Sequence, residues 1–524
     1  MVEASFGEGS GRLRFDADGV VTALRATARP ELSLLERAGE PVVRTGGRVL
    51  AWGSAEVGRD VDELEVTRSG PGGLRVTVRH TFEPVWTVRL LLVHLGAVPV
   101  DLDEVTLSWR PAAGCRAVAL AAGVEAAYAV QPADGRGPVL VGQLTGGLQT
   151  GVDPTGLGLG PVRLEPGARR VAQWRWRLAR APRQAARPGQ LPRSTWLDVD
   201  QTVSLAATPD VAVVAGGLTV ETEPDAVELS APEPGAYRVE LRSARGTVGL
   251  DLDCAPPLEA LVDRAAEEAV AVPPGKRVRL TGGAAGIVAQ EALARQRFDD
   301  PDPVEDALDL LAGTLSEGSA PDPLDLAFLA REAERTGDRF LLERAEAGVL
   351  AAPAAAPGLG LAATRVLLGG MEAGRSPAPL VAHLATLAAG VAEPAAAGLP
   401  EVAAGLELLL LTRRRSPDPE RTPRSGPLAA ALRRVGAELG AGLPGRRLPD
   451  PTGGVPVDVL GHLAAVLTLV PEEGGDDLSG WWGVPPSEVG RAAAAEARVR
   501  LARSGPAAGA DRALAWLVLR AALG

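Results

Sequence analysis

Two clusters of acidic residues carry the side chains best suited to chemistry in this sequence. The first, RFDDPDPVED, runs from Arg297 to Asp306 and holds Asp299 and Asp300 beside Phe298. Hydrolysis of a glycosidic bond needs two carboxylic groups that flank the bond, one protonated and one ionised. Asp299 and Asp300 are therefore candidate catalytic acids.

The second cluster, PEEGGDDLSGWWGVPPSEVG, spans residues 471–490 and is a long loop signal within a helical region. Asp476 and Asp477 lie close in sequence to Trp481 and Trp482. Charge beside a flat aromatic surface suits a carbohydrate or another small polar ligand. Asp476 and Asp477 are thus further catalytic candidates, with the tryptophans as ligand-binding residues. In the other interpretation, the tryptophans plug the end of a helical array or pack on a β domain.

Neighbouring acids in the first cluster have a structural explanation. The sequence DPVE at 302–305 and the sequence DPLD at 322–325 share one pattern. An acid stands at the N-cap, proline follows at the first helical position, and a second acid stands at the third. We therefore predict helix N-caps at Asp302 and Asp322. Asp299 and Asp300 are left without such a role.

Composition and charge exclude several classes of function. The chain has 524 residues, enough for more than one domain, and a formal net charge of −12. Nucleic-acid binding depends on clustered positive charge, so a general nucleic-acid partner is not expected. No apolar stretch is long enough to span a membrane. The N-terminus lacks a basic segment followed by an apolar one, which predicts a cytoplasmic protein without a signal peptide.

Metal, disulfide and cofactor signals are missing from the sequence. Cys115 and Cys254 have no CxxC spacing, so we expect buried free thiols. The four histidines are far apart and form no HExxH motif. No metal or cofactor is predicted. The Ala-, Gly-, Pro- and Arg-rich usage is typical of a GC-rich bacterial genome.

The first 180 residues read as β structure. GLRVTVRHTF at 73–82 alternates apolar and polar side chains, and VDLDEVTLSWRP at 100–111 places Val105, Leu107 and Trp109 on one face. Glycine- and proline-rich turns separate these runs. Strands at this spacing, without helical periodicity between them, predict a large antiparallel sandwich, like a supersandwich, over residues 1–180.

The stretch QWRWRL at 173–178 tests this interpretation. At a period of two, Trp174 and Trp176 share one face of a strand while Arg175 and Arg177 share the other. The tryptophans are then core residues and the arginines a solvated or ion-paired face. This alternation argues against a nucleic-acid groove.

A second, smaller β region follows a linker. Residues 181–196 are rich in Pro, Arg and Gln and show no periodicity, as is typical of a linker. Residues 197–256 contain several short alternating runs divided by Gly/Pro turns, which predicts a small Ig-like β-sandwich.

From residue 257 to residue 524 the periodicity becomes helical. Apolar residues recur at intervals of three and four in about twelve segments. Short connections pair such helices as antiparallel hairpins, which predicts an all-α array. The predicted segments are 258–270, 285–297, 303–316, 323–336, 339–352, 358–372, 378–392, 400–414, 427–440, 455–470, 487–503 and 510–523.

One of these hairpins carries a family resemblance. In FLAREAERTGDRFLLERAEAGV, from Phe328 to Val349, Gly337 suits a helix C-terminus and Asp338 suits the next N-cap. The hairpin resembles those of the (α/α)6-toroid proteins, the six-hairpin glycosidase superfamily. That resemblance implies a toroid preceded by a β-supersandwich domain, with carboxylates and aromatic platforms that act on glycosidic bonds. No catalytic motif of the superfamily aligns with this sequence.

Two functional hypotheses follow for the whole chain. The first is a glycosidase-like protein that acts on a carbohydrate, or binds one without cleaving it, since the helical region has few aromatic residues. The second is a non-enzymatic platform in which the hairpins form an open α-solenoid with a concave face for a protein partner. Contact between the last hairpin and the first favours the enzyme-like hypothesis, and two free ends favour the platform. The oligomeric state is left open.

Overall fold

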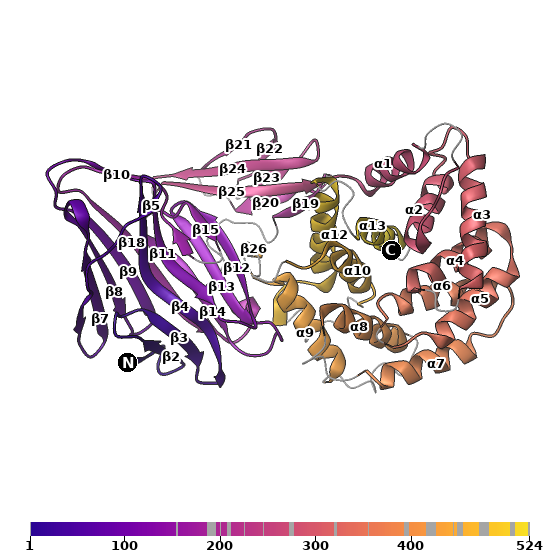
Figure 1. The fold of residues 1–524 in the computed structure, drawn as a ribbon, viewed down its shortest axis with the longest axis horizontal. Coiled ribbons are helices and arrows are strands. Elements are labelled where there is room, and N and C mark those ends of the chain that lie inside the picture. The colour runs from indigo at the N-terminus through magenta and orange to yellow at the C-terminus, as the bar shows by residue number, and fades with distance from the viewer. Residues whose placement is uncertain are drawn as a thin grey trace.

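The chain folds into a large β part, a small β part and a helical ring, in that order along the sequence (Figure 1). In this view the large β part lies to the left of the ring. The small β part lies above and reaches from the large β part to the top of the ring. The computed structural model describes residues 2–153, 156–185, 195–199, 201–206, 211–224, 226–244, 246–271, 277–318, 322–354, 356–391, 398–414, 426–443, 445–447, 454–470, 481–503 and 509–521.

Two antiparallel sheets face each other in the large β part. The first has the strand order β1-β2-β3-β4-β11-β16-β15, with β5 beside β4. Its strands are β1 Val2–Phe6, β2 Gly11–Phe15, β3 Val21–Ala26, β4 Arg29–Thr45, β5 Arg48–Val49, β11 Glu104–Pro111, β15 Gly151–Asp153 and β16 Gly156–Gly158.

The second sheet has the order β26-β12-β13-β14-β18-β9-β8-β7-β6. Its strands are β6 Glu56–Arg59, β7 Glu63–Ser69, β8 Leu74–Thr81, β9 Trp86–His94, β12 Cys115–Ala122, β13 Glu125–Pro132, β14 Val139–Gly146, β18 Arg169–Ala179 and β26 Arg446–Arg447. A separate pair joins β10 Val100–Leu102 to β17 Val162–Leu164. Apolar side chains from both large sheets form one core, which confirms the predicted sandwich.

Strand β18 alternates as its sequence predicts. Trp174 and Trp176 are buried, and the ring of Trp176 stacks on Trp86 and Trp109 at centroid distances of 5.6 and 5.8 Å. Arg175 is exposed on the opposite face. The aromatic rings of this strand therefore belong to the core of the sandwich.

The small β part contains two short sheets around their own core. The first has the order β19-β25-β24-β21 and the second β20-β23-β22. The strands are β19 Trp196–Asp198, β20 Val203–Ala206, β21 Ala212–Ala215, β22 Thr219–Thr222, β23 Ala226–Ser230, β24 Gly235–Ser243 and β25 Gly246–Ala255. Cys254 is buried here and Cys115 in the large sandwich, and burial raises the pKa of Cys115 to about 12.

The helices of the C-terminal part form a closed ring. In the described residues they are α1 Leu258–Val270, α2 Gly282–Ala294, α3 Asp302–Glu317, α4 Pro323–Thr336, α5 Arg339–Ala351, α6 Leu359–Glu372, α7 Ala378–Ala389, α8 Leu399–Arg414, α9 Pro427–Leu439, α10 Val457–Leu467, α12 Pro486–Arg503 and α13 Ala510–Ala521. Helices α2, α4, α6, α8, α10 and α13 contact one another in succession, and α13 packs on α2. This last contact closes the array.

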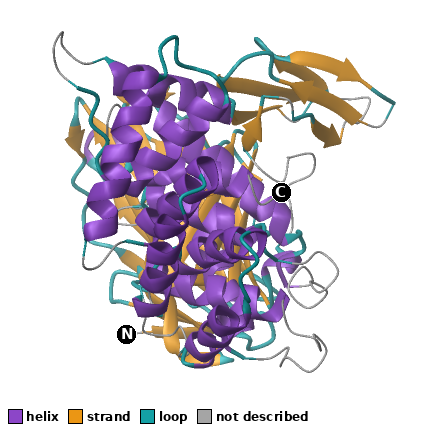
Figure 2. Cartoon of the chain, turned by 90° about the vertical axis from the view of Figure 1, so that its right-hand side faces the viewer, coloured by secondary structure: helices purple, strands orange, loops and turns teal. Residues whose placement is uncertain are grey.

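The other helices pack against the members of this inner ring, as expected of consecutive antiparallel hairpins. Figure 2 shows the helices in front of the large sheets, with strands of the small β part at the upper right. No helix in the described ranges is long and apolar enough to cross a membrane.

The hairpin that carried the family resemblance has the predicted geometry. Gly337 ends α4 with a φ of 74°, in the left-handed region that glycine tolerates. Asp338 begins α5, and its carboxylate accepts a hydrogen bond of 2.8 Å from the backbone N–H of Phe340. Both predictions for this turn are confirmed.

One connection between the parts was not predicted. The loop after α9 contributes β26, which pairs with Val118 and Ala119 of β12 and so extends the large sheet. Nearby, the guanidinium of Arg116 contacts the carboxylate of Glu438 at 2.6 Å. The helical ring is thus joined to the sandwich through both backbone and side-chain bonds.

Candidate functional site

Asp299 and Asp300 lie in the loop between α2 and α3, where they line an open groove of about 1100 Å³. Both side chains are exposed, whereas Phe298 is half-buried and packs against the helical core. The groove runs between α1 and α3. Its lining residues are Glu267, Val270, Arg277, Val278, Arg297, Phe298, Asp299, Asp300, Asp302, Pro303, Asp306, Ala307 and Leu310.

The two capping predictions have different outcomes. At α4, Asp322 accepts from the backbone N–H of Leu324 and Asp325 accepts from that of Asp322, so the capping box is confirmed. At α3 the prediction is wrong, because Asp302 is the first helical residue and the N-cap is Pro301. Asp300 accepts a hydrogen bond of 3.3 Å from the backbone N–H of Asp302 instead.

This difference separates the two candidate acids of the groove. The carboxylate of Asp300 supports the backbone at the start of α3. Asp299 makes no side-chain hydrogen bond or ion pair among the described residues, and its carboxylate is open to the groove. Asp299 is therefore the acid that a ligand would meet without disturbing the helix.

The second predicted cluster is described only in part. Asp476 and Asp477 lie outside the described residues. Trp482 is 1% exposed, and its ring lies against the backbone of Gly436 in α9. Trp481 is half-buried, with the guanidinium carbon of Arg433 5.4 Å from its ring centroid. Neither tryptophan lines the groove that holds Asp299 and Asp300.

The buried ring of Trp482 matches the packing interpretation of this pair, because a sugar needs an accessible ring face. Trp481 keeps part of its surface exposed, so it stays a candidate for ligand stacking together with Asp476 and Asp477. The structure thus separates two tryptophans that the sequence presents as one platform.

The inside of the ring holds a buried polar cluster that sequence reasoning missed. Glu407 of α8 is 0% exposed and accepts hydrogen bonds from the backbone N–H groups of Gly358, at 2.9 Å, and Leu361. The Nε2 atom of His462 in α10 lies 3.0 Å from the same carboxylate. The imidazole also packs on Trp516 of α13, with 4.8 Å between ring centroids.

This cluster joins four inner helices at one point. Glu407 neutralises the N-terminal end of α6, where backbone donors lack helical partners. The hydrogen bond to Glu407 fixes the tautomer and the orientation of His462. A signal was available, since Glu407 interrupts the apolar run GLELLLL at 405–411. An ionisable residue in such a run indicates a buried partner, although not which one.

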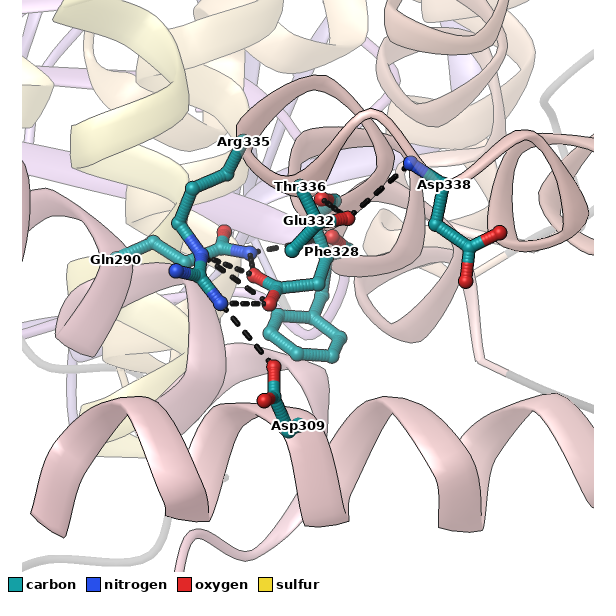
Figure 3. A network of polar contacts seen from close by, with 7 residues as sticks. All are labelled: Gln290, Asp309, Phe328, Glu332, Arg335, Thr336 and Asp338. Atoms are coloured by element: carbon teal, nitrogen blue, oxygen red, sulfur yellow. Dashed lines mark hydrogen bonds and ion pairs between the residues drawn. The ribbon is translucent and has the colours of Figure 1, made fainter. Parts of the chain in front are cut away.

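A second buried carboxylate lies on α4 (Figure 3). Glu332 is 0% exposed, and its carboxylate accepts from the Nε2 of Gln290 at 2.7 Å and from the guanidinium of Arg335 at 3.2 Å. Arg335 also contacts Asp309 of α3 at 3.2 Å. The network therefore joins α2, α3 and α4, and its contacts are those of a structural ion pair.

Comparison with known proteins finds the same architecture in a solved structure. No family model matches the chain, and no curated protein matches it in sequence. Among solved structures, a polysaccharide lyase superposes with a TM-score of 0.70 over 98% of this chain and 99% of the other, at 11% identity. The chain shares its fold with that lyase. At this identity the likeness establishes the fold.

Proposed function

We propose that this protein acts on a carbohydrate polymer and binds saccharide units in the groove beside Asp299 and Phe298. The observation that carries the proposal is the architecture. A β-sandwich followed by a closed ring of helices matches a polysaccharide lyase over nearly the whole of both chains. Because fold alone does not assign an activity, the side chains of the groove must supply the chemistry.

The groove has the size and the side chains that a saccharide requires. Its volume of about 1100 Å³ is slightly larger than that of most ligand pockets, and suits more than one sugar ring. The carboxylate of Asp299 can accept hydrogen bonds from sugar hydroxyls, and Arg277 can donate to them. The half-buried ring of Phe298 offers an apolar surface on which a sugar ring can pack.

Binding is better supported than hydrolysis. A glycosidase-like reaction needs two carboxylic groups on opposite sides of one bond. Asp300 is engaged at the start of α3, which leaves Asp299 to act with another lining acid such as Asp306 or Glu267. We therefore assign saccharide binding to the groove and treat cleavage as a separate property to be measured.

The test is a binding screen of the purified protein against neutral and acidic oligosaccharides, followed by calorimetric titration of each hit. We expect Phe298→Ala and Asp299→Asn to weaken binding at least tenfold. Phe340→Ala is the matched aromatic control, because Phe340 is 57% exposed on α5. Glu56→Gln on β6 is the acidic control. Release of new reducing ends, lost in Asp299→Asn, would add cleavage to the assignment.

Two outcomes would reject the groove as the site. One is the absence of binding to any saccharide in the screen. The other is binding that survives Phe298→Ala and Asp299→Asn but is lost in Trp481→Ala, which would transfer the site to the loop of Asp476 and Asp477.

The protein-platform hypothesis has less structural support. An open α-solenoid presents a concave face between two free ends. Here α13 packs on α2, so the helices form a ring. Ring closure is the feature that favours the enzyme-like hypothesis over the platform.

A further inference from the structure

A second hollow, of about 630 Å³, lies where the small β part meets the helical ring. Three arginines from two helices converge on it, in contrast to the acidic lining of the groove. Its lining residues are Asp198, Val199, Gln201, Thr202, Pro257, Leu258, Glu259, Arg491, Arg498, Leu517, Arg520 and Ala521.

Helix geometry explains why these arginines meet. Arg491 and Arg498 are seven residues apart on α12, so two helical turns place them on one face. Arg520 lies in the last turn of α13. Helix α12 packs against α13, α1 and strands β19 and β25, which brings the arginines to one hollow beside Asp198.

The carboxylates in the lining neutralise only one of the three arginines, Arg498. Asp198 pairs with Arg498, whose Nη1 also donates to the carbonyl of Pro256 at 3.0 Å. Glu259 pairs with Arg295, at 3.2 Å. Within the described ranges no carboxylate pairs with Arg491 or Arg520. The Nε atom of Arg520 is buried and has no hydrogen-bond partner.

Arg498 and Arg520 are half-buried and Arg491 is exposed, so the three like charges repel one another at the edge of the solvent. Burial, and then the nearby charge of Arg520, lower the pKa of Arg498 to about 10. Burial, and then the charge of Arg491, lower the pKa of Arg520. Like charges held together at a half-buried site cost free energy, and a bound anion removes that cost.

We infer that this hollow, which we call the arginine pocket, binds a tetrahedral oxyanion, either phosphate or sulfate, free or as a sugar ester. Guanidinium groups match such oxyanions because their N–H donors lie in one plane and reach two oxygens at once. Arg498 is already paired with Asp198. We therefore expect Arg491 and Arg520 to supply the donors to the anion. The pocket is separate from the groove, so this inference does not depend on saccharide binding there.

The first experiment is calorimetric titration of the full chain with inorganic phosphate and with sulfate, at constant ionic strength set by sodium chloride. We expect saturable binding of one anion per chain. Arg491→Gln and Arg520→Gln should each weaken it at least tenfold. The control Arg75→Gln removes an exposed arginine of β8 and should leave binding unchanged.

A second set of titrations identifies the source of the anion. Glucose 6-phosphate is compared with inorganic phosphate, and glucose serves as the uncharged control. Tighter binding of the ester assigns the pocket to a phosphorylated or sulfated sugar, and equal binding assigns it to the free anion. Both results support the oxyanion site, whereas glucose binding as strong as that of the ester would overturn it.

Two other results would also overturn the inference. The double variant Arg491→Gln, Arg520→Gln could bind phosphate as well as the original chain. Chloride could compete fully at equal ionic strength, which would indicate only general charge screening. Circular dichroism of each variant separates these results from loss of folding.

Discussion

In the described part of the chain, charged side chains inside the helical ring are paired, whereas several of those at the groove and the arginine pocket are not. Glu407 and Glu332 are fully buried, and each carboxylate has several hydrogen-bond partners. In the arginine pocket, Arg491 and Arg520 have no carboxylate partner among the described residues. In the groove, Asp299 is similarly open.

The difference separates structural charges from charges available to a ligand. A carboxylate without water must be paired, because an isolated buried charge costs several kcal/mol. Charges at an open hollow can stay unpaired, since water solvates them until a ligand arrives. A Glu–His pair inside the ring, whose hydrogen bonds are satisfied, is therefore weaker evidence for a ligand site than an arginine without a carboxylate partner at a hollow.

The largest effect should follow from breaking the pair inside the ring. Glu407→Ala leaves the backbone donors of α6 and the Nε2 of His462 without an acceptor, at a cost of about 3–5 kcal/mol. We expect a marked decrease in the midpoint of the thermal transition by scanning calorimetry. Glu401→Ala, at an exposed position of the same helix, should change it little. Equal effects of the two variants would contradict the structural role of Glu407.

His80 is a buried side chain that stays neutral without a partner of opposite charge among the described residues, and the pH dependence of stability tests this. Burial lowers the pKa of His80, in the large sandwich, from 6.5 to about 3. The unfolded chain then binds a proton that the folded chain excludes, so stability is present above pH 6.5 and is lost as the pH falls toward 3. The slope is about 1.4 kcal/mol per pH unit, or roughly 2–3 kcal/mol between pH 6.5 and 4.5.

The matched variants for this pH effect are His80→Gln and His383→Gln. Glutamine at position 80 keeps an acceptor for the indole N–H of Trp86, which His80 accepts at 3.2 Å. Thermal midpoints measured across the acid range should depend less on pH in His80→Gln than in the original chain. If the pH dependence of the midpoint decreased in His383→Gln but not in His80→Gln, the prediction for His80 would be contradicted.

The sequences DPVE at 302–305 and DPLD at 322–325 predict effects of intermediate size on stability. Asp322 caps α4 and also contacts Arg512 at 3.0 Å, so Asp322→Ala should cost about 1–2 kcal/mol. Asp302 has no capping bond, so Asp302→Ala should cost less than about 0.5 kcal/mol. Thermal midpoints of the two variants should differ in that order, and a reversed order would show that both motifs had been misassigned.

Sequence reasoning succeeds where the pattern lies within one helix or strand. Helical periodicity predicted segments at 258–270 and 323–336, and α1 and α4 have those bounds. Alternation in QWRWRL correctly assigned Trp174 and Trp176 to the core. Such patterns are local, because the period of side chains on one element records which face is buried.

The remaining features depend on contacts between distant residues. DPVE and DPLD look alike, but only Asp322 is a cap, and the packing around each helix start decides this. His462 and Glu407 are 55 residues apart, and β26 pairs with a strand more than 300 residues earlier. Closure of the ring by α13 on α2, and the meeting of three arginines, likewise require the folded chain.

The smallest effect is expected at Arg491, and there its sign should depend on the ligand. Without an oxyanion, Arg491→Gln removes a charge that repels Arg520, so the thermal midpoint should stay unchanged or rise slightly, within about 0.5 kcal/mol of stability. In saturating phosphate the original chain gains stability from binding and the variant gains less, so the order reverses. Glu407→Ala should remain destabilising in both conditions, because its partners lie within the protein. The contradicting result is a midpoint of Arg491→Gln in phosphate that equals or exceeds that of the original chain. Arg491 would then not contribute to anion binding, and the distinction between the ring interior and the hollows would not hold at the arginine pocket.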